Sequence, residues 1–201
     1  MGRPREHGEE TRETLIAAAE RLVATGGPGA LSVRTVADAA GTSTRAVYSL
    51  FGSKKGLVDV LAERAFRYLG AGLAAADETD DPAGDLIRLG SRMYRNFVRE
   101  HPSLFRIAFQ RIVPEFQMTP ALVTVRREVW GQLEAKVARL AEVDGLGGRS
   151  VLEAAVEFNA MCEGLANAEL RGGTLRETDG VDAETVWRDA FTTVVRGFAA
   201  S

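Results

Sequence analysis

Apolar residues recur with the period of an α-helix along almost the whole chain, and no stretch shows the sustained alternation of a half-buried β-strand. Glycine, proline and acidic turn sequences divide this pattern into separate segments, the first of which ends at residues 26–29. The sequence therefore predicts an all-α protein of about nine helices. They are expected near residues 9–24, 33–40, 43–51, 54–76, 83–100, 102–111, 120–143, 149–171 and 183–199.

The composition excludes several classes of protein. Apolar residues make up 45% of the 201 residues and charged residues 26%, which is enough apolar material for a packed core. One cysteine, Cys162, cannot form a disulfide framework within the chain, and two histidines leave too few ligands for a zinc cluster. No apolar run is long enough to span a membrane, and the first residues lack the apolar stretch of a signal peptide. We therefore expect a cytoplasmic protein with no metal site, no cofactor and no membrane partner.

The net charge of −3 hides an asymmetry along the chain. Residues 1–58 contain eight Lys and Arg against six Asp and Glu, whereas the remainder contains 17 against 22. A basic end on an acidic chain is typical of a segment that meets a polyanion such as nucleic acid. The difference is small, so it supports a nucleic-acid partner only together with a motif.

Two short predicted helices joined by a tight turn, at residues 32–51, have the spacing of a helix-turn-helix. Gly41 fits the turn because the chain must reverse there within a few residues. Val47 and Phe51 lie four residues apart and anchor the second helix to the core. The other face then carries the hydroxyl, guanidinium and phenol groups that contact bases and phosphates: Thr44, Arg45, Tyr48 and Ser49. On spacing alone, an ordinary helical hairpin with a solvated face is an equally good interpretation.

Residues 31–58 resemble the DNA-binding region of TetR-family transcriptional regulators. The matching frame is Val36, Ala37, Gly41, Tyr48, Phe51, Lys54 and Leu57. The resemblance covers about residues 8–70, and beyond them the chain resembles the family only in the number and length of its helices. It implies a helix-turn-helix DNA-binding domain over residues 1–53 and a helical effector-binding and dimerisation domain over residues 54–201. It also implies a sequence-specific transcriptional regulator, a repressor that a small-molecule effector releases from a palindromic operator.

The resemblance assigns the third helix to the major groove of DNA. Arg45 is the best candidate for reading a base, since a guanidinium bridges O6 and N7 of guanine; a phosphate contact or a solvated side chain is the alternative. Tyr48 and Lys54 match family positions that contact phosphates, and Tyr48 has the alternative role of an aromatic support for the first helix. Arg3 and Arg5 form either a minor-groove arm or a disordered tail. The candidate DNA-binding residues are Ser32, Arg34, Ser43, Thr44, Arg45, Ala46, Tyr48, Ser49 and Lys54.

The last two predicted helices are suited to dimerisation. Residues 187–198 carry a long apolar stripe, and the helix at 149–171 is apolar on one face through Phe158 and on another through Leu152 and Val156. One face can pack on the chain's own core and the other on a second copy. The resemblance implies a homodimer on double-stranded DNA, and a monomer whose core encloses this helix is the alternative.

Aromatic residues concentrate in the middle of the chain, where the resemblance implies a pocket for an unidentified small-molecule effector. Such pockets are mostly apolar, with a few polar groups that orient the ligand, and Asn159, Gln110 and Arg111 are the candidates for that role. An aromatic stripe at helical spacing is more often ordinary core. The candidate pocket residues are Met93, Phe97, Phe105, Phe109, Trp130, Phe158, Asn159 and Met161.

Other functions have little support in the sequence. The chain has no nucleophile elbow, no phosphate-binding loop after a strand and no His-Glu-x-x-His pair, so we expect no catalytic residues and no enzymatic activity. A helical module that binds another protein without binding DNA is an alternative, and so is an activator of the same fold. DNA binding weakens steeply as salt rises, which separates it from the protein-binding alternative.

Overall fold

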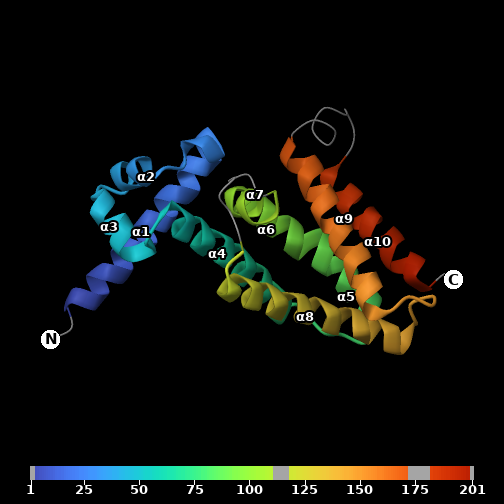
Figure 1. Cartoon of the computed structure of the whole chain (residues 1–201). Helices are drawn as coiled ribbons and strands as arrows, with labels where there is room; N and C mark the ends of the chain where they lie inside the picture. The colour runs from blue at the N-terminus through green and yellow to red at the C-terminus, as the bar shows by residue number, and fades with distance from the viewer. Residues whose placement is uncertain (1–2, 111–117, 172–181, 200–201) are drawn as a thin grey trace. The chain divides into compact units, whose positions relative to one another are not determined.

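The computed structural model describes residues 3–110, 118–171 and 182–199 of the chain (Figure 1). Within these ranges every regular element is a helix, which confirms the all-α prediction. The elements are α1 (Arg3–Gly26), η1 (Pro28–Ala30), α2 (Val33–Ala39), α3 (Thr44–Phe51), α4 (Lys54–Ala75), α5 (Pro82–Arg88), η2 (Leu89–Tyr94), α6 (Arg95–Glu100), α7 (Pro102–Phe109), α8 (Pro120–Val143), α9 (Val151–Arg171) and α10 (Ala183–Ala199). Segment η2 is a π-helical turn that joins α5 to α6 without a break. With these three as one helix, and with the short η1 set aside, the described ranges hold nine helices as predicted.

The chain divides into two compact units by its internal packing. The first unit comprises Met1–Phe66 and His101–Val125, and the second comprises Arg67–Glu100 and Arg126–Ser201. Helix α7 therefore shares a unit with the helix-turn-helix segment, although α5 and α6 lie between them in the sequence. The boundary expected between residues 53 and 54 is a division by function, whereas these units are a division by packing, so that boundary stays a prediction.

Helix α1 packs against α2, α3 and α7 in the first unit. Its buried face comprises Leu15, Ile16, Ala19 and Val23. Val47 and Phe51 of α3 are buried as their spacing predicts. In α7, Phe105 stacks on Phe109 with ring centroids 5.2 Å apart, and Phe109 meets Phe66 of α4 edge-on at 5.4 Å. The helix-turn-helix thus rests on a core that α1, α4 and α7 complete.

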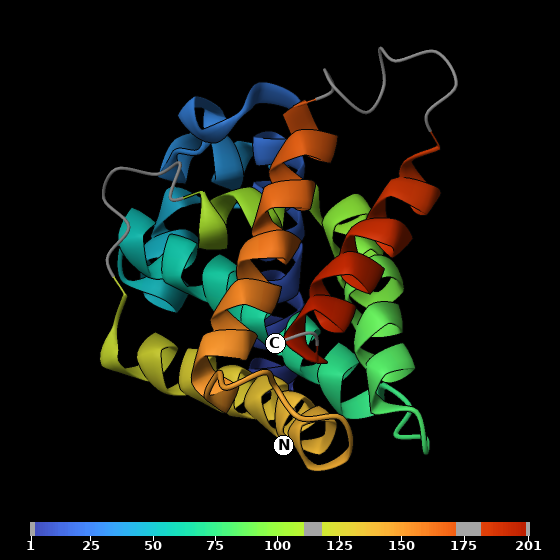
Figure 2. The same ribbon diagram turned by 90° about the vertical axis from the view of Figure 1, so that its right-hand side faces the viewer.

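In the second unit α9 and α10 lie side by side, and α10 also packs against α5 and η2 (Figure 2). The apolar stripe of α10 is buried within this unit, with Trp187 and Phe191 fully covered and Phe198 only 1% exposed. Phe191 lies against Phe158 of α9, with ring centroids 4.9 Å apart. These side chains fill the core of their own unit, whereas Ala190 and Val194 of the same stripe are half-buried, so dimerisation through α10 stays a prediction.

Helix α9 buries one of its two apolar faces and leaves the other accessible. Ala154 and Phe158 are buried, whereas Leu152 is 54% exposed and Val156 is 50% exposed. Two small exposed residues continue this line at intervals of four. The resulting surface, called the α9 row below, consists of Leu152, Val156, Ala160 and Gly164.

No helix in the described ranges is long and apolar enough to cross a membrane. The same residues contain no group of three or more His, Cys, Asp or Glu side chains placed to hold a metal ion. Cys162 is buried in α9, and burial raises the pKa of its thiol well above the usual value. A neutral buried thiol is a poor nucleophile, so Cys162 acts as a small apolar core residue.

Candidate nucleic-acid interface

The helix-turn-helix begins with a capping box at the start of α2. The side-chain oxygen of Ser32 accepts a hydrogen bond from the backbone N–H of Thr35 at 3.1 Å. The hydroxyl oxygen of Thr35 accepts one in return from the backbone N–H of Ser32 at 3.0 Å. These bonds satisfy N–H groups that the start of a helix otherwise leaves unpaired, so this short helix has a well-defined first turn.

Gly41 and Ser43 make the turn between α2 and α3. Gly41 has φ +65°, a left-handed conformation that side-chain-bearing residues adopt only with strain. The backbone N–H of Thr42 donates to the carbonyl oxygen of Ala37 at 2.9 Å and closes the end of α2. Ser43 then caps α3 by accepting a hydrogen bond from the N–H of Ala46 at 3.3 Å. The role predicted for Gly41 in the turn is confirmed.

Helix α3 buries one face and exposes the other. Its exposed positions form two adjacent rows along the helix, Thr44 with Tyr48 and Arg45 with Ser49, each pair one turn apart. Tyr48 is 55% exposed. The structure brings the predicted groove-facing side chains onto one surface, while Ala46 beside them is half-buried. This surface, called the α3 face below, consists of Thr44, Arg45, Tyr48 and Ser49.

The α3 face carries positive charge with no acidic residue near it in sequence. Residues 43–55 include Arg45, Lys54 and Lys55 but no Asp or Glu. No carboxylate among the described residues forms an ion pair with Arg45. Lys55 donates to Asp59 one turn later at 2.8 Å, and Lys54 lies half-buried at the first position of α4. An exposed guanidinium between hydroxyl groups has the chemistry that base edges and phosphates require.

Ser32 and Arg34 both lie at the start of α2, but only the side chain of Arg34 is free of the helix cap and available to contact DNA. The side chain of Arg34 is 88% exposed, and its nearest acidic partner is Asp38 at 3.9 Å. Exposed pairs of this kind contribute little to stability, so a phosphate can replace that carboxylate at small cost. The hydroxyl of Ser32 instead lies 2.9 Å from that of Thr35, within the cap. A DNA contact by Ser32 therefore competes with its role in the cap.

One glycine that the sequence pattern did not single out joins α3 to α4. A β-carbon on Gly56 would lie 1.9 Å from the carbonyl oxygen of Phe51, so no residue with a side chain fits there without displacing the backbone. Ser53 caps α4 by accepting a hydrogen bond from the N–H of Gly56 at 3.0 Å. The signal in the sequence was a glycine in the first turn of a helix, where it is otherwise unfavourable.

A second group that the sequence did not indicate ties α4 to α1. Arg64 donates to the Glu13 carboxylate at 2.7 Å, and its Nε lies 3.4 Å from Oε1 of Glu20. Burial raises the pKa of Glu20, and the charge of Arg64 only partly offsets that effect. No local pattern could have found this cluster, since Glu13 and Arg64 are 51 residues apart. It holds the base of the helix-turn-helix together within the first unit.

The candidate effector residues fall into both compact units. Phe105 and Phe109 belong to the first unit, where they stack on each other. The second unit holds Met93, Phe97, Trp130, Phe158, Asn159 and Met161. Arg111 and the side chains of Arg3 and Arg5 lie outside the described residues.

Trp187 adds a polar group to the aromatic cluster of the second unit. Its ring centroid lies 6.1 Å from that of Phe191, which in turn contacts Phe158. Its indole N–H is buried and has no hydrogen-bond acceptor among the described residues, although buried indole N–H groups normally find one. By contrast, Asn159 and Trp130 each donate at 2.8 Å to a glutamate one turn along their own helix. Helical periodicity marked Trp187 as apolar and could not show that its indole N–H lacks an acceptor within the described part of the chain.

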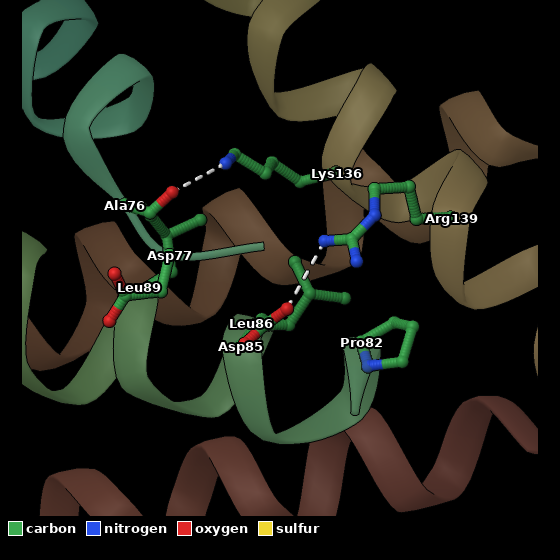
Figure 3. A pocket seen from close by; sticks show the side chains of 8 residues that line it. All are labelled: Ala76, Asp77, Pro82, Asp85, Leu86, Leu89, Lys136 and Arg139. Carbon is green, nitrogen blue, oxygen red and sulfur yellow. Dashed lines mark hydrogen bonds and ion pairs between the residues drawn. The ribbon is translucent and has the colours of Figure 1, made fainter. Parts of the chain in front are cut away.

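A small hollow in the second unit lies between the residues that follow α4, helix α5 and helix α8 (Figure 3). It is lined by Ala76, Asp77, Pro82, Asp85, Leu86, Leu89, Lys136 and Arg139. Arg139 donates to Asp85 at 3.1 Å, and Lys136 donates to the carbonyl oxygen of Ala76 at 3.0 Å. None of the candidate effector residues lines this hollow. Asp85, Lys136 and Arg139 already bind partners in the protein, so this group of residues anchors the end of α4.

The geometry described above defines a class of protein. A capped helix-turn-helix whose second helix exposes guanidinium, phenol and hydroxyl groups is typical of helix-turn-helix DNA-binding proteins. Residues 15–61 match the family model of bacterial regulatory proteins of the tetR family, and residues 87–194 match that of the tetracyclin repressor-like C-terminal domain. The chain belongs to the TetR family. It is therefore a DNA-binding transcriptional regulator and not an enzyme.

Solved structures share the fold over nearly the whole chain. The TetR-family transcriptional regulator PfmR from Thermus thermophilus is 26% identical with a TM-score of 0.68, and the match covers 91% of this chain and 97% of that one. A protein of unknown function from Rhodococcus sp. RHA1 has 24% identity and a TM-score of 0.78, with 94% and 95% covered. A TetR variant from Acinetobacter baumannii AYE, in complex with minocycline, has 20% identity and a TM-score of 0.64, with 92% and 94% covered. No curated protein matches the sequence significantly.

Proposed function

We propose that this regulator is a repressor that binds a palindromic operator as a homodimer and leaves it when a small-molecule effector binds. The observation that carries the DNA-binding part is the α3 face, which is exposed, free of carboxylates and held on a helix capped at its start. The capped turn matters because a recognition helix must keep its orientation while its side chains exchange water for DNA.

The α3 face enters the major groove in this proposal. Arg45 contacts a base, and Thr44, Ala46 and Ser49 line the groove around it. Tyr48 and Lys54 contact phosphates, where the lysine charge adds to the positive end of the α4 dipole. Ser32, Arg34 and Ser43 contact the backbone at the edges of the site, and Arg34 is the most accessible of the three.

The α9 row is the proposed contact between two copies. Its apolar members Leu152 and Val156 are half-exposed, and the small residues Ala160 and Gly164 allow a second helix to approach closely. A nearby two-fold axis would pair the row with its own copy, as closed dimers require. On a palindromic operator, the two recognition helices of a homodimer are expected to lie about 34–36 Å apart, one turn of DNA.

The effector is proposed to bind among the aromatic residues of the second unit. The TetR variant that shares the fold binds minocycline, and the indole N–H of Trp187, which has no acceptor among the described residues, is a donor for an acceptor group. An effector releases the protein from DNA only if it binds the DNA-incompetent conformation more tightly. Repression is proposed because a dimer on a promoter blocks polymerase. An activator of the same fold is the runner-up, and a reporter gene behind the recovered operator separates the two.

The DNA-binding part is tested by selecting duplexes from a random pool with the full chain at about 0.15 M salt. The expected result is a palindrome with half-sites roughly one turn apart and an affinity that falls steeply as salt rises. Failure to enrich any sequence, with protein that is folded by circular dichroism, would contradict the proposal.

The effector part is tested separately by tryptophan fluorescence. The chain has two tryptophans, so Trp130→Phe leaves Trp187 as the single reporter. Compounds that release the protein from the operator should change Trp187 emission at the same concentration. Release without any change in Trp187 emission would place the effector elsewhere.

A further inference from the structure

We infer that α3 reads one guanine in each half of the operator, contacted by Arg45 at O6 and N7, and that no adenine is read by paired hydrogen bonds from a side chain of the helix-turn-helix. This inference rests on the proposed function, since it assumes that the α3 face enters the major groove. It goes further by stating which base pairs the protein can distinguish.

The first step of the argument is the inventory of side chains. Bidentate reading of adenine requires Asn or Gln, and Asp or Glu is the usual specific acceptor for the cytosine amino group. The first Asn in the chain is Asn96 and the first Gln is Gln110, so residues 1–58 contain neither. Between residues 31 and 58 the one acidic residue is Asp38, on α2. The helix-turn-helix therefore has no side chain that recognises adenine by two hydrogen bonds.

The second step is the placement of Arg45. It is the second residue of α3, and the first turn of a recognition helix is the part that reaches base edges. Its side chain is exposed, and none of the described carboxylates neutralises it. Asp38 lies 3.9 Å from Arg34, on the preceding helix. Arg45 can therefore present two guanidinium N–H groups to one guanine without first breaking an ion pair.

The third step concerns the neighbours of Arg45. Thr44 and Ser49 have short hydroxyl side chains, and a hydroxyl discriminates poorly because it both donates and accepts. Ala46 offers only a methyl group, which suits contact with the thymine methyl. Tyr48 is long and 55% exposed, so its hydroxyl extends toward a phosphate. The part of the half-site that α3 faces is thus expected to contain one strongly required guanine among positions with weak preferences.

The test uses the duplex selected by the full chain, altered one atom at a time. The required guanine is replaced by 7-deazaguanine, which lacks N7, or by inosine, which keeps O6 and N7 but lacks the minor-groove amino group. We expect the first change to weaken binding by about 5- to 150-fold, in the range of one specific base contact, and the second to leave the affinity within about twofold.

Two variants complete the test. Arg45→Ala should abolish the difference between guanine and 7-deazaguanine and relax the selected sequence at that position alone. Arg34→Ala is the matched control, since it removes an exposed arginine on α2. It should weaken binding to all duplexes alike and keep the preference for guanine.

The possible failures are distinguishable. If no duplex is selected, the proposed function itself fails. If a palindrome is selected but it contains no required guanine, or if Arg45→Ala selects the same guanine, the protein binds DNA and this inference is wrong. A loss of affinity with inosine as large as with 7-deazaguanine would also overturn it, because the guanine would then be recognised through its minor-groove amino group as well as through O6 and N7.

Discussion

A β-carbon on Gly56 would lie 1.9 Å from the carbonyl oxygen of Phe51, the last residue of α3. The first turn of α4 therefore touches the end of α3 through backbone atoms alone. Such a contact couples the position of α4 closely to that of α3, because no flexible side chain lies between the two backbones to absorb a shift. Any change in the start of α4 must then move α3 as well.

Substitution Gly56→Ala is expected to separate these two helices and to reduce both stability and operator binding. Forcing an extra methyl group into a packed site costs about 1–3 kcal/mol. Gly131→Ala in α8 is the matched control, since a β-carbon there meets nothing within 4 Å. It should stabilise the chain by about 0.5–1 kcal/mol, because alanine favours the helix. Urea unfolding of both variants checks this, and equal stability for the two would disprove the close contact.

The phosphate contacts proposed for Tyr48 and Arg34 differ in their dependence on salt. Tyr48→Phe removes one neutral hydroxyl, so we expect operator affinity to fall about tenfold with an unchanged slope against salt. Arg34→Ala removes a charge, so the slope should decrease by about one counterion. Fluorescence anisotropy over a series of salt concentrations measures both. A reduced slope for Tyr48→Phe would show that its effect is on the orientation of α3 and not on a phosphate.

The proposed dimer predicts a specific effect of charge in the α9 row. Val156→Arg should give monomers, because it places a charge in the centre of an apolar contact while the half-exposed site lets the monomer stay folded. Val123→Arg in α8 is the control, since Val123 is also exposed, at 38%, but lies outside the row. Sedimentation velocity at several concentrations distinguishes the two. A Val156→Arg protein that remains dimeric would exclude the row as the interface.

The helices of the first unit could be predicted from the sequence because the residues that start, end and bury each helix lie within a few positions of one another. Val47 and Phe51 are four residues apart, Ser32 and Ser43 stand at helix starts, and Gly41 marks a turn. The two features missed in this unit depend on distance in the sequence or on the backbone. The pairing of Arg64 with Glu13 spans 51 residues, and the approach of Gly56 to Phe51 is a contact of the main chain.

The second unit shows what helical periodicity in the sequence cannot predict. An apolar stripe indicates that a helix face is covered, but not whether its own chain or another copy covers it. The stripe with Trp187 and Phe191 on α10 is covered from within, whereas Leu152 and Val156 on α9 are left exposed. The π-helical turn from Leu89 to Tyr94 likewise has no local signature, since its residues continue the helical pattern of α5 and α6.

Asp85 holds the loop that follows α4 in the second unit (Figure 3). Its side chain is only 5% exposed, and it accepts hydrogen bonds from the backbone N–H of Thr79 at 2.8 Å and from its hydroxyl at 2.9 Å. Arg139 and Arg88 donate to the same carboxylate. Burial alone would raise the pKa of Asp85, but the hydrogen bonds from Thr79 and the two arginines outweigh it and lower the pKa below its usual value of 3.8.

A lowered pKa means that the folded chain binds this proton less readily than the unfolded chain does. The carboxylate therefore stabilises the fold fully above pH 3.8, and that stabilisation is lost as the pH falls through and below that value.

Asp85→Asn should cost about 2–3 kcal/mol at neutral pH, since hydrogen bonds to a charged group are lost. The difference from the natural chain should shrink below pH 3.8. Asp80→Asn, on an exposed residue of the same loop, is the control and should change stability by less than about 0.5 kcal/mol. Urea unfolding from about pH 7 to about pH 3 measures both, and a difference for Asp85→Asn that stays constant over this range would show that its charge is not what anchors the loop.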